Sequence, residues 1–548
     1  MEIRPAATLA LIRDTDEGIQ VLLLQRTWDA AFLPGFYVFP GGAVDASDHA
    51  CQQWLDGHDD RSASAALGLP DGGAPFMIAA IRECFEEAGV LLALKPDGSL
   101  LQEHTEATCK ARADMNNGTL TLADLCQQQR LKLPLDRLAY LSHWVTPPGP
   151  PSRFDTRFFV AAAPPQQVSH DGVETIDHVW LSPADALEDH RMGRRLLVAP
   201  TLRTLRILSD FDTTAAVMAF AHGQPAEVIP HTPWPAQKNR QASMIEPGEP
   251  AYHEVRKLDP EQKGHASATI VPGTATLLGP QLQRLTAGNP GMMTGPGTNT
   301  YILGGADDVT VIDPGPDDAD HIARILALTG HRIRQVLVTH THRDHSPGAR
   351  ALHAATGAAV MGMAAPDEPT QDLEFQASKA LRDGDTVTTG AGTLRVIHTP
   401  GHASNHLCYL LESQKILFSG DHIMQGSTVV INPPDGDMTA YLASLHRLLQ
   451  HDIDYIAPGH GFLMAHAHAI VDFLTTHRLS RERKVITALS DHGPATLRAL
   501  TKHAYDDVPV AIHGVASRSL LAHLIKLEAD GKALNQSDQW TFVQPPST

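Results

Sequence analysis

The sequence predicts an α/β protein of several domains. Its 548 residues and 59.1 kDa exceed what one hydrophobic core normally organises. Short β-branched runs alternate with helical stretches over most of the chain. From about Leu479 the pattern becomes mainly helical. Hydrophobic residues at 42% and charged residues at 19% are typical of packed globular domains.

Charge and hydropathy exclude several classes of protein. The net charge of −19 gives no general field that attracts duplex DNA or acidic lipid. The first apolar run is short, between Pro5 and Arg13, and no later run reaches the length of about 18 residues that a membrane span needs. The 5 cysteines are odd in number and lack a CxxC pair, which argues against disulfides and a thiolate metal cage. We therefore expect a cytoplasmic protein without a signal peptide or membrane contact, whose oligomeric state the sequence does not indicate.

The first 224 residues are expected to form a mixed α/β domain. Two apolar runs flank the segment from Asp14 to Gly18, which is typical of a β-hairpin. Helical spacing follows from Phe76 to Leu92, and Ser182 with Pro183 has the composition of a helix start.

Three further segments are predicted after residue 224. Residues 225–272 contain 8 prolines and are expected to be a connector. Residues 273–477 alternate strands and helices, which predicts a second α/β domain. Residues 478–548 combine helices with a hairpin around Ser537 and Asp538, which describes a winged helix.

Histidines and aspartates of the second α/β domain follow directly on predicted strands. An HxHxDH pattern comes after the run QVLVT, and three more candidates follow the runs LRVI, ILFS and DYI. Loops at strand ends can aim such side chains at one shared centre. The candidates are His340, His342, Asp344, His345, His402, Asp421 and His460.

This set of side chains predicts a hydrolytic metal centre. Imidazole and carboxylate are ligands for zinc and related ions, and five histidines with two aspartates suffice for two metals that share one carboxylate. Two such ions can activate a water to hydroxide near neutral pH. The alternative, unrelated structural histidines, does not account for the spacing.

The motifs THxHxDH, HTPGH, GD and PGHG occur in this order between Gln281 and Leu474, and there the chain resembles the metallo-β-lactamase superfamily. The resemblance implies an αββα sandwich with two divalent metals, zinc or else iron or manganese. It also implies that Asp344 handles protons and that Asp313 orients a ligand histidine. His406 and His422 flank ligands and are expected either to support them or to be structural, and not to bind metal. The implied ligands are His340, His342 and His402 for one metal, Asp344, His345 and His460 for the other, and Asp421 between them.

The stretches GTNTY and HASNHLCYLLE, followed by a winged helix, look like the lactamase-beta-like protein 2 group. That group includes an endoribonuclease that prefers single strands. An ester, a thioester and a phosphodiester such as single-stranded RNA therefore all stay open as substrates. A basic cluster at the start of the winged helix is either a solvated helix face or a guide for a single strand. It consists of Arg478, Arg481, Arg483 and Lys484.

Three glutamates, Glu83, Glu86 and Glu87, share one side of the helix predicted at 76–92, opposite its apolar side. We expect this acidic face to look outward. Because like charges at this spacing repel, a hard cation such as Mg²⁺ or Mn²⁺ would stabilise the face and could bridge to a diphosphate. The alternative is a solvated acidic surface.

FPGG at 39–42 and RECFEEAGV at 82–90 resemble the two halves of the Nudix box, and the likeness covers residues 3–222. Asp48 stands where the box has its first glutamate, and 33 residues instead of 7 separate it from Arg82. The insertion and the stretch WVTPPGPPSRFDTRFFV are similar to the subgroup with a mammalian peroxisomal coenzyme A diphosphatase. The resemblance implies an α/β/α sandwich in which Glu83, Glu86 and Glu87 hold Mg²⁺ and Arg82 orients them.

Our leading hypothesis is a hydrolase with two centres. One would attack an ester, a thioester or a phosphodiester such as single-stranded RNA, and the other a nucleoside or coenzyme A diphosphate. A second hypothesis keeps the metallo-β-lactamase catalyst but limits the Nudix domain to binding a nucleotide or acyl-CoA. A third is a nucleic-acid-binding regulator that acts through its winged helix.

Overall fold

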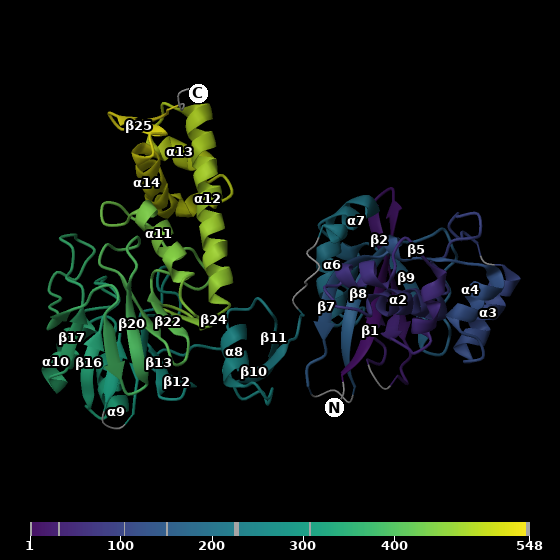
Figure 1. The fold of residues 1–548 in the computed structure, drawn as a ribbon, viewed down its shortest axis with the longest axis horizontal. Coiled ribbons are helices and arrows are strands. Elements are labelled where there is room, and N and C mark those ends of the chain that lie inside the picture. Colours follow the sequence, from purple (N-terminus) through teal and green to yellow (C-terminus); the bar gives the residue numbers. More distant parts are fainter. Residues whose placement is uncertain are drawn as a thin grey trace. The chain divides into compact units, whose positions relative to one another are not determined.

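The structure is a computed structural model that describes residues 3–30, 33–103, 105–148, 152–223, 230–305 and 308–543. The chain divides into two compact units, Met1–Pro233 and Trp234–Thr548 (Figure 1). Within the described ranges, no helix has both the length and the apolar character required to cross a bilayer.

A mixed sheet in the order β3-β2-β1-β8-β7 forms the centre of the first unit, with β4 paired to β1 and β9 to β2. β1 and β2 pair antiparallel up to Thr15 opposite Gly18, which confirms the predicted hairpin. β1 and β8 pair in parallel. The strands are β1 (Ile3–Thr15), β2 (Gly18–Arg26), β3 (Tyr37–Val38), β4 (Gly41–Ala43), β7 (Ala139–Val145), β8 (Arg153–Ala162) and β9 (Thr175–Leu181).

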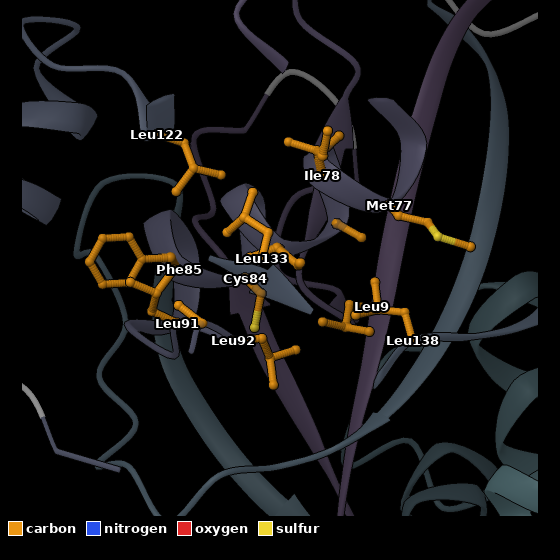
Figure 2. Close-up of a cluster of buried hydrophobic side chains, with 14 of the residues drawn as sticks. Leu9, Met77, Ile78, Cys84, Phe85, Leu91, Leu92, Leu122, Leu133 and Leu138 are labelled. Carbon is orange, nitrogen blue, oxygen red and sulfur yellow. The ribbon is translucent and has the colours of Figure 1, made fainter. Parts of the chain in front are cut away.

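Helices cover both faces of this sheet because alternate residues of its central strands point to opposite sides. Leu9 and Leu11 of β1 pack with α2 (Gly73–Ala88), as Figure 2 shows for Leu9, Met77 and Ile78. The residues between and after them, Ala10 and Ile12, belong to the opposite core, with α5 (Pro183–Arg191), α6 (Ala199–Leu208) and α7 (Thr214–His222). The predicted α/β/α sandwich is confirmed. Ser182 caps α5 as expected.

The insertion between the two halves of the Nudix box is folded. It contains η1 (Asp48–Trp54), β5 (Leu55–Asp56) and α1 (Asp60–Ala66), and β5 pairs with β6 (Leu133–Pro134). Both η1 and α1 contact α2, so the insertion stays beside the glutamate helix. η2 (Leu135–Arg137), α3 (Glu106–Asn116) and α4 (Leu122–Gln129) complete the unit.

Two stacked sheets form the main body of the second unit. The first has the order β12 to β18 and the second the order β19 to β24. The first contains β12 (Ala275–Gly279), β13 (Leu282–Thr286), β14 (Asn299–Leu303), β15 (Val309–Ile312), β16 (Ile333–Leu337), β17 (Ala359–Gly362) and β18 (Lys379–Ala380). The second contains β19 (Thr386–Thr389), β20 (Gly392–His398), β21 (Leu407–Leu411), β22 (Ile416–Gly420), β23 (Tyr455–Pro458) and β24 (Met464–Ala465).

Each of these sheets is buried on both faces. Side chains such as Leu337 and Phe418 fill the space between the sheets. The outer face of the first sheet packs on α9 (Ala319–Thr329) and α10 (Gly348–Thr356), and that of the second on α11 (Met438–Leu448) and the start of α12 (Ala467–His492). This arrangement confirms the predicted αββα sandwich.

A small hairpin and helix precede the first of these sheets, within the range predicted as a connector. β10 (Trp234–Lys238), β11 (Gln241–Ile245) and α8 (Tyr252–Leu258) share a core of their own. Glu254 of α8 accepts two hydrogen bonds from Arg284 of β13, at 2.6 and 2.9 Å. Both side chains are buried, so this ion pair ties α8 to the sandwich.

The C-terminal elements confirm the predicted winged helix. α13 (Leu497–Ala504) and α14 (His513–Ala529) pack on the far end of α12, as Figure 1 shows, and η3 (Val510–Ile512) contacts α14. β25 (Ala533–Gln536) and β26 (Gln539–Phe542) form the hairpin. Its turn residues Ser537 and Asp538 have φ of 53° and 62°, values that a tight hairpin turn needs.

We expect Glu254→Gln to lower the free energy of unfolding of the second unit by about 3 kcal/mol, because it leaves Arg284 buried without a counter-charge. Urea unfolding measures the change. Glu412→Gln is the matched control, since Glu412 pairs with Arg395 on the surface and such pairs contribute about 0 to 1 kcal/mol. Equal effects of the two variants would contradict this prediction.

Candidate metal centres

Three histidine nitrogens meet at one point beyond the ends of β16 and β20. Nε2 of His340 lies 2.9 Å from Nδ1 of His342, and Nε2 of His402 lies 3.0 Å from the same atom. These spacings are close to the separation of about 3.3 Å between two nitrogen ligands of one tetrahedral zinc ion. Since a single ring nitrogen cannot satisfy both neighbours through protons, the group fits a cation.

A second group contains Asp344, His345, Asp421 and His460, whose ligand atoms lie within 4.8 Å of one another. Oδ1 of Asp421 is 3.4 Å from Nε2 of His345 and 3.3 Å from Nε2 of His460. Oδ2 of Asp344 is 3.5 Å from each of the same two nitrogens. All except Asp344 are buried.

Asp421 lies between the two groups. Its Oδ1 faces His345 and His460, while its Oδ2 is 3.9 Å from Nε2 of His402 in the first group. The short β22 ends at Gly420, whose φ of +46° turns the chain directly before this aspartate.

Hydrogen bonds hold the imidazoles by their outer nitrogens. Nδ1 of His345 donates to Asp313 at 2.9 Å, Nδ1 of His402 to the carbonyl of Val430 at 2.8 Å, and Nδ1 of His460 to the carbonyl of Gly297 at 3.2 Å. Each ring therefore presents its Nε2 to the centre as an available ligand atom.

Asp313 makes the contact that the sequence predicts. Besides His345, it accepts the backbone N–H and the hydroxyl of Thr339, each at 2.7 Å. Because the Thr339 hydroxyl uses its hydrogen in the bond to Asp313, its oxygen is left to accept from Nδ1 of His340 at 3.0 Å. One buried carboxylate thereby orients a histidine in each group.

The electrostatics of the two groups favour bound cations. Burial opposes ionisation of Asp421, but His460 and His345 outweigh it and hold the pKa of this carboxyl well below its usual range. Burial lowers the pKa of His460, yet Asp421 and Asp344 raise it overall to about 9. The buried atoms Nε2 of His345, Nε2 of His460 and Oδ1 of Asp421 have no hydrogen-bond partner in the part of the chain that the structure describes. Divalent ions would compete with the protons for these sites.

His406 and His422 are buried beside the groups but belong to neither. Nδ1 of His406 lies 2.9 Å from the hydroxyl of Thr399.

A pocket of about 790 Å³ gives access to the centre. His342, Asp344, His402 and Asp421 line its floor, and residues of α12, η3 and α14 line another wall. The winged helix thus contributes to the space in which a substrate of this centre would lie.

In the first unit, Arg82 of α2 connects both halves of the predicted Nudix box. Its guanidinium donates to Asp48 at 2.8 and 3.1 Å, to Glu83 at 2.9 Å and to Glu86 at 2.8 Å. These bonds place the buried Asp48 beside Arg82 despite the long insertion between them.

The expectation that the acidic face looks outward is wrong for Glu87. It is only 4% exposed and accepts the N–H of Gly41 at 3.0 Å, because β4 passes directly over the helix. A Cβ at Gly42 would come within 2.3 Å of Oε1 of Glu83, so a larger residue there would displace the end of that carboxylate. Glu83, Glu86 and Glu87 do not form a group within 4.8 Å among the described residues, since Arg82 holds two of them.

The raised pKa values of the carboxylates on α2 show that negative charge is not fully compensated there, which a bound cation would relieve. Burial raises the pKa of Glu87 well above its ordinary value, and Glu83 raises it further. Burial, opposed by Arg82 and aided by Glu86, raises the pKa of Glu83 to about 7. A divalent ion bound here would favour the ionised forms.

Three family models match the chain. They are described as metallo-beta-lactamase superfamily, matching residues 293–460, NUDT19 Nudix domain, matching residues 58–208, and beta-lactamase associated winged helix domain, matching residues 496–540.

An atrochrysone carboxyl ACP thioesterase of Aspergillus chevalieri is 32% identical over 267 residues, which are 46% of this chain and 82% of that protein. The chain belongs to the metallo-β-lactamase superfamily. A beta-lactamase-like protein 2 homolog of Caenorhabditis elegans is 31% identical over 46% of this chain and 85% of its own length. A Nudix hydrolase structure from Alicyclobacillus acidocaldarius is 30% identical, with a TM-score of 0.35, over 40% of this chain and 96% of that one. The protein is a metallo-β-lactamase-fold hydrolase that also carries a Nudix domain, and both domains imply divalent metals.

The basic cluster expected at the start of the winged helix does not form one exposed surface. Arg478 is buried at 3% exposure, so neither expectation for the cluster holds for it. Arg481 pairs with Asp507 at 2.8 Å, and Lys484 pairs with Asp506 and Asp507 at 3.1 and 3.0 Å. These pairs neutralise most of the charge that would attract a nucleic acid.

Two contributors to the metallo-β-lactamase site escaped the sequence analysis. The carbonyl of Val430 fixes His402, and Asn299 donates to the carbonyls of Pro458 and Gly461 on either side of His460. Asn299 lies within the GTNTY stretch, so an amide in a buried strand was an available signal. A backbone carbonyl leaves no trace in a sequence.

We expect Asp313→Ala to weaken metal binding about 10- to 100-fold. The substitution removes the hydrogen bonds that hold His345 directly and His340 through Thr339. Competition with a chromophoric chelator measures the affinity. Asp317→Ala, an exposed neighbour in the same loop, is the control. Unchanged affinity in Asp313→Ala would refute the orienting role.

Proposed function

We propose that the metallo-β-lactamase domain is a binuclear hydrolase of thioesters. His340, His342 and His402 would hold one metal, Asp344, His345 and His460 the other, and Asp421 would bridge them. The observation that carries the proposal is the position of Asp421, whose two oxygens face different histidine groups. The donor set of imidazole and carboxylate favours zinc, with iron and manganese as the alternatives.

The bound ions would supply Lewis acidity, which lowers the pKa of a water molecule and polarises the attacked carbonyl. Asp344 is the carboxylate that can move protons, because it lines the pocket and its side chain is 29% exposed. Burial opposes its ionisation, but His345 and His460 lower its pKa, so it is ionised and able to accept a proton from water at Oδ2. Asp313 and Val430 keep the histidines in place during turnover.

The pocket wall favours an acyl chain over a nucleobase. Val508, Ile512, Val515 and Ala516 give this wall an aliphatic surface. Base recognition in single strands uses exposed aromatic rings. Tyr505, the one Phe, Tyr or Trp side chain among the described pocket residues, is 7% exposed, with the guanidinium of Arg481 at 4.3 Å from its ring. The thioesterase named above supports the same substrate class, whereas single-stranded RNA is the less favoured alternative.

For the Nudix domain we propose Mg²⁺-dependent hydrolysis of a nucleoside or coenzyme A diphosphate, with Mn²⁺ as the alternative ion. Glu83, Glu86 and Glu87 would hold the ion, and Arg82 would set their positions. The network of Arg82 with Asp48, Glu83 and Glu86 carries this proposal, because it joins both halves of the box. We assign this activity to residues 1–224 and the thioesterase to 273–477 with the winged helix 478–548, joined by 225–272.

We expect Asp421→Ala to lower thioester hydrolysis about a thousandfold and to reduce bound metal, because both ions lose a shared ligand. A panel of acyl thioesters, lactones and single-stranded RNA, with metal content measured on the same samples, checks this. Asp452→Ala, on an exposed residue paired with Lys415, is the control. If RNA but no thioester is cleaved, the substrate proposal fails while the metal centre stands.

We expect Glu86→Gln to lower diphosphate hydrolysis about 100-fold or more in the presence of Mg²⁺ and to leave thioester hydrolysis unchanged. Asp421→Ala should show the reverse pattern. Turnover of coenzyme A and nucleoside diphosphates measures the first activity, and Glu17→Gln in the exposed β1–β2 turn serves as control. Wild-type turnover in Glu86→Gln would leave the Nudix domain a binding module.

A further inference from the structure

Three consecutive residues, Val429 to Ile431, connect the metal centre with the winged helix. The carbonyl of Val430 accepts from Nδ1 of His402 at 2.8 Å. On one side, the carbonyl of Val429 accepts from the guanidinium of Arg478 in α12. On the other, the N–H of Ile431 donates to the hydroxyl of Ser519 in α14 at 3.4 Å. The backbone that holds His402 is therefore itself held on both sides from the C-terminal segment.

Arg478 lowers the folding stability at this position. It is 3% exposed, and no carboxylate of the described residues lies within ion-pair distance of it. A buried charge without a counter-charge lowers stability, and an apolar side chain of similar volume would pack with less loss. Packing alone therefore does not account for an arginine here.

The same arginine reaches the neighbourhood of Asp421. Its guanidinium carbon lies 5.3 Å from the centre of the Tyr441 ring. The hydroxyl of Tyr441 donates to the carbonyl of His422 at 3.1 Å, directly after Asp421 in the chain. Tyr441 also packs against Gly401, the residue before His402. A Cβ on Gly401 would come within 2.4 Å of the Cα of Tyr441, so the two backbones are in close contact.

We infer that Arg478 is a positioning residue of the metallo-β-lactamase centre, through which the winged helix fixes His402 and the chain beside Asp421. Ser519 has the same role through Ile431. The winged helix is thus a structural part of the metal centre and not a separate nucleic-acid-binding module. The inference rests on the proposed role of His402 and Asp421 as metal ligands.

A small rotation of the His402 ring would follow from the loss of this support. Residues that hold a ligand by a hydrogen bond typically change metal affinity about 10- to 100-fold when they are replaced. The effect should be confined to the metal centre, because α12 keeps its apolar contacts through Val471 and Leu474 on one side and Val485 on the other.

The test uses the full chain with Arg478→Met, Arg478→Lys and the control Arg483→Met, an exposed arginine five residues further along the same helix. We expect Arg478→Met to lose zinc to a chelator at a concentration about 10-fold lower than the wild type does. The absorption spectrum of the cobalt-loaded protein should change as well, because it reports the ligands. The zinc retention of Arg478→Lys should lie between those of Arg478→Met and the wild type, since an ammonium lacks the planar fork of a guanidinium. Arg483→Met should retain zinc as the wild type does.

Far-UV circular dichroism shows whether each variant folds. If Arg478→Met does not fold, the zinc retention of Arg478→Lys tests the positioning role. Wild-type zinc retention and an unchanged cobalt spectrum in a folded Arg478 variant would overturn the inference, even if its melting temperature fell. His402→Ala separates the two claims. If it retains the metal of the wild type, the proposed ligand set is wrong, whereas loss of metal in His402→Ala but not in the Arg478 variants rejects only the positioning role.

Discussion

The burial of Asp421 between two sets of imidazoles is the constraint on which the second unit depends. A carboxylate removed from water is stable only with compensating charge, and here that charge comes from His345 and His460 or from the ions they would bind. The loops after β16, β20, β22 and β23 must therefore all end within reach of one point. The two stacked sheets make this possible, because strands that are buried on both faces hold their ends in fixed positions.

The first unit gathers charge in a different way. Its carboxylates lie on one helix, and the compensating cation is a residue of the same helix, Arg82, which also binds Asp48 from the far side of the insertion. Glu87 receives a backbone N–H from β4 instead. A site of oxygen ligands balanced by an arginine suits a hard, weakly held ion, whereas the imidazole site of the second unit suits a tightly held one.

The sequence predicted the features that depend on neighbouring residues. The β1–β2 hairpin, the Ser182 cap and the turn at Ser537 and Asp538 each follow from residues within a few positions. The α/β class followed from the alternation of strand-like and helical stretches, and the two sandwich folds were implied by the motifs that resemble known families. Contacts between distant segments could not be predicted. Glu87 was expected at the surface because β4, which covers it, lies 46 positions away in the chain. Arg478 was assigned to a surface cluster because nothing in the sequence indicates its bond to the carbonyl of Val429. Periodicity places a residue on a helix face but does not say what covers that face.

Helix α12 belongs to two hydrophobic cores. Val471 and Leu474 pack under the second sheet, while Val485 and Leu489 pack with α13 and α14. A continuous hydrogen-bonded rod between them transmits any displacement of one core to the other. The two cores are therefore mechanically and thermodynamically coupled, and loss of order in the winged helix would lower the cooperativity with which the whole unit unfolds.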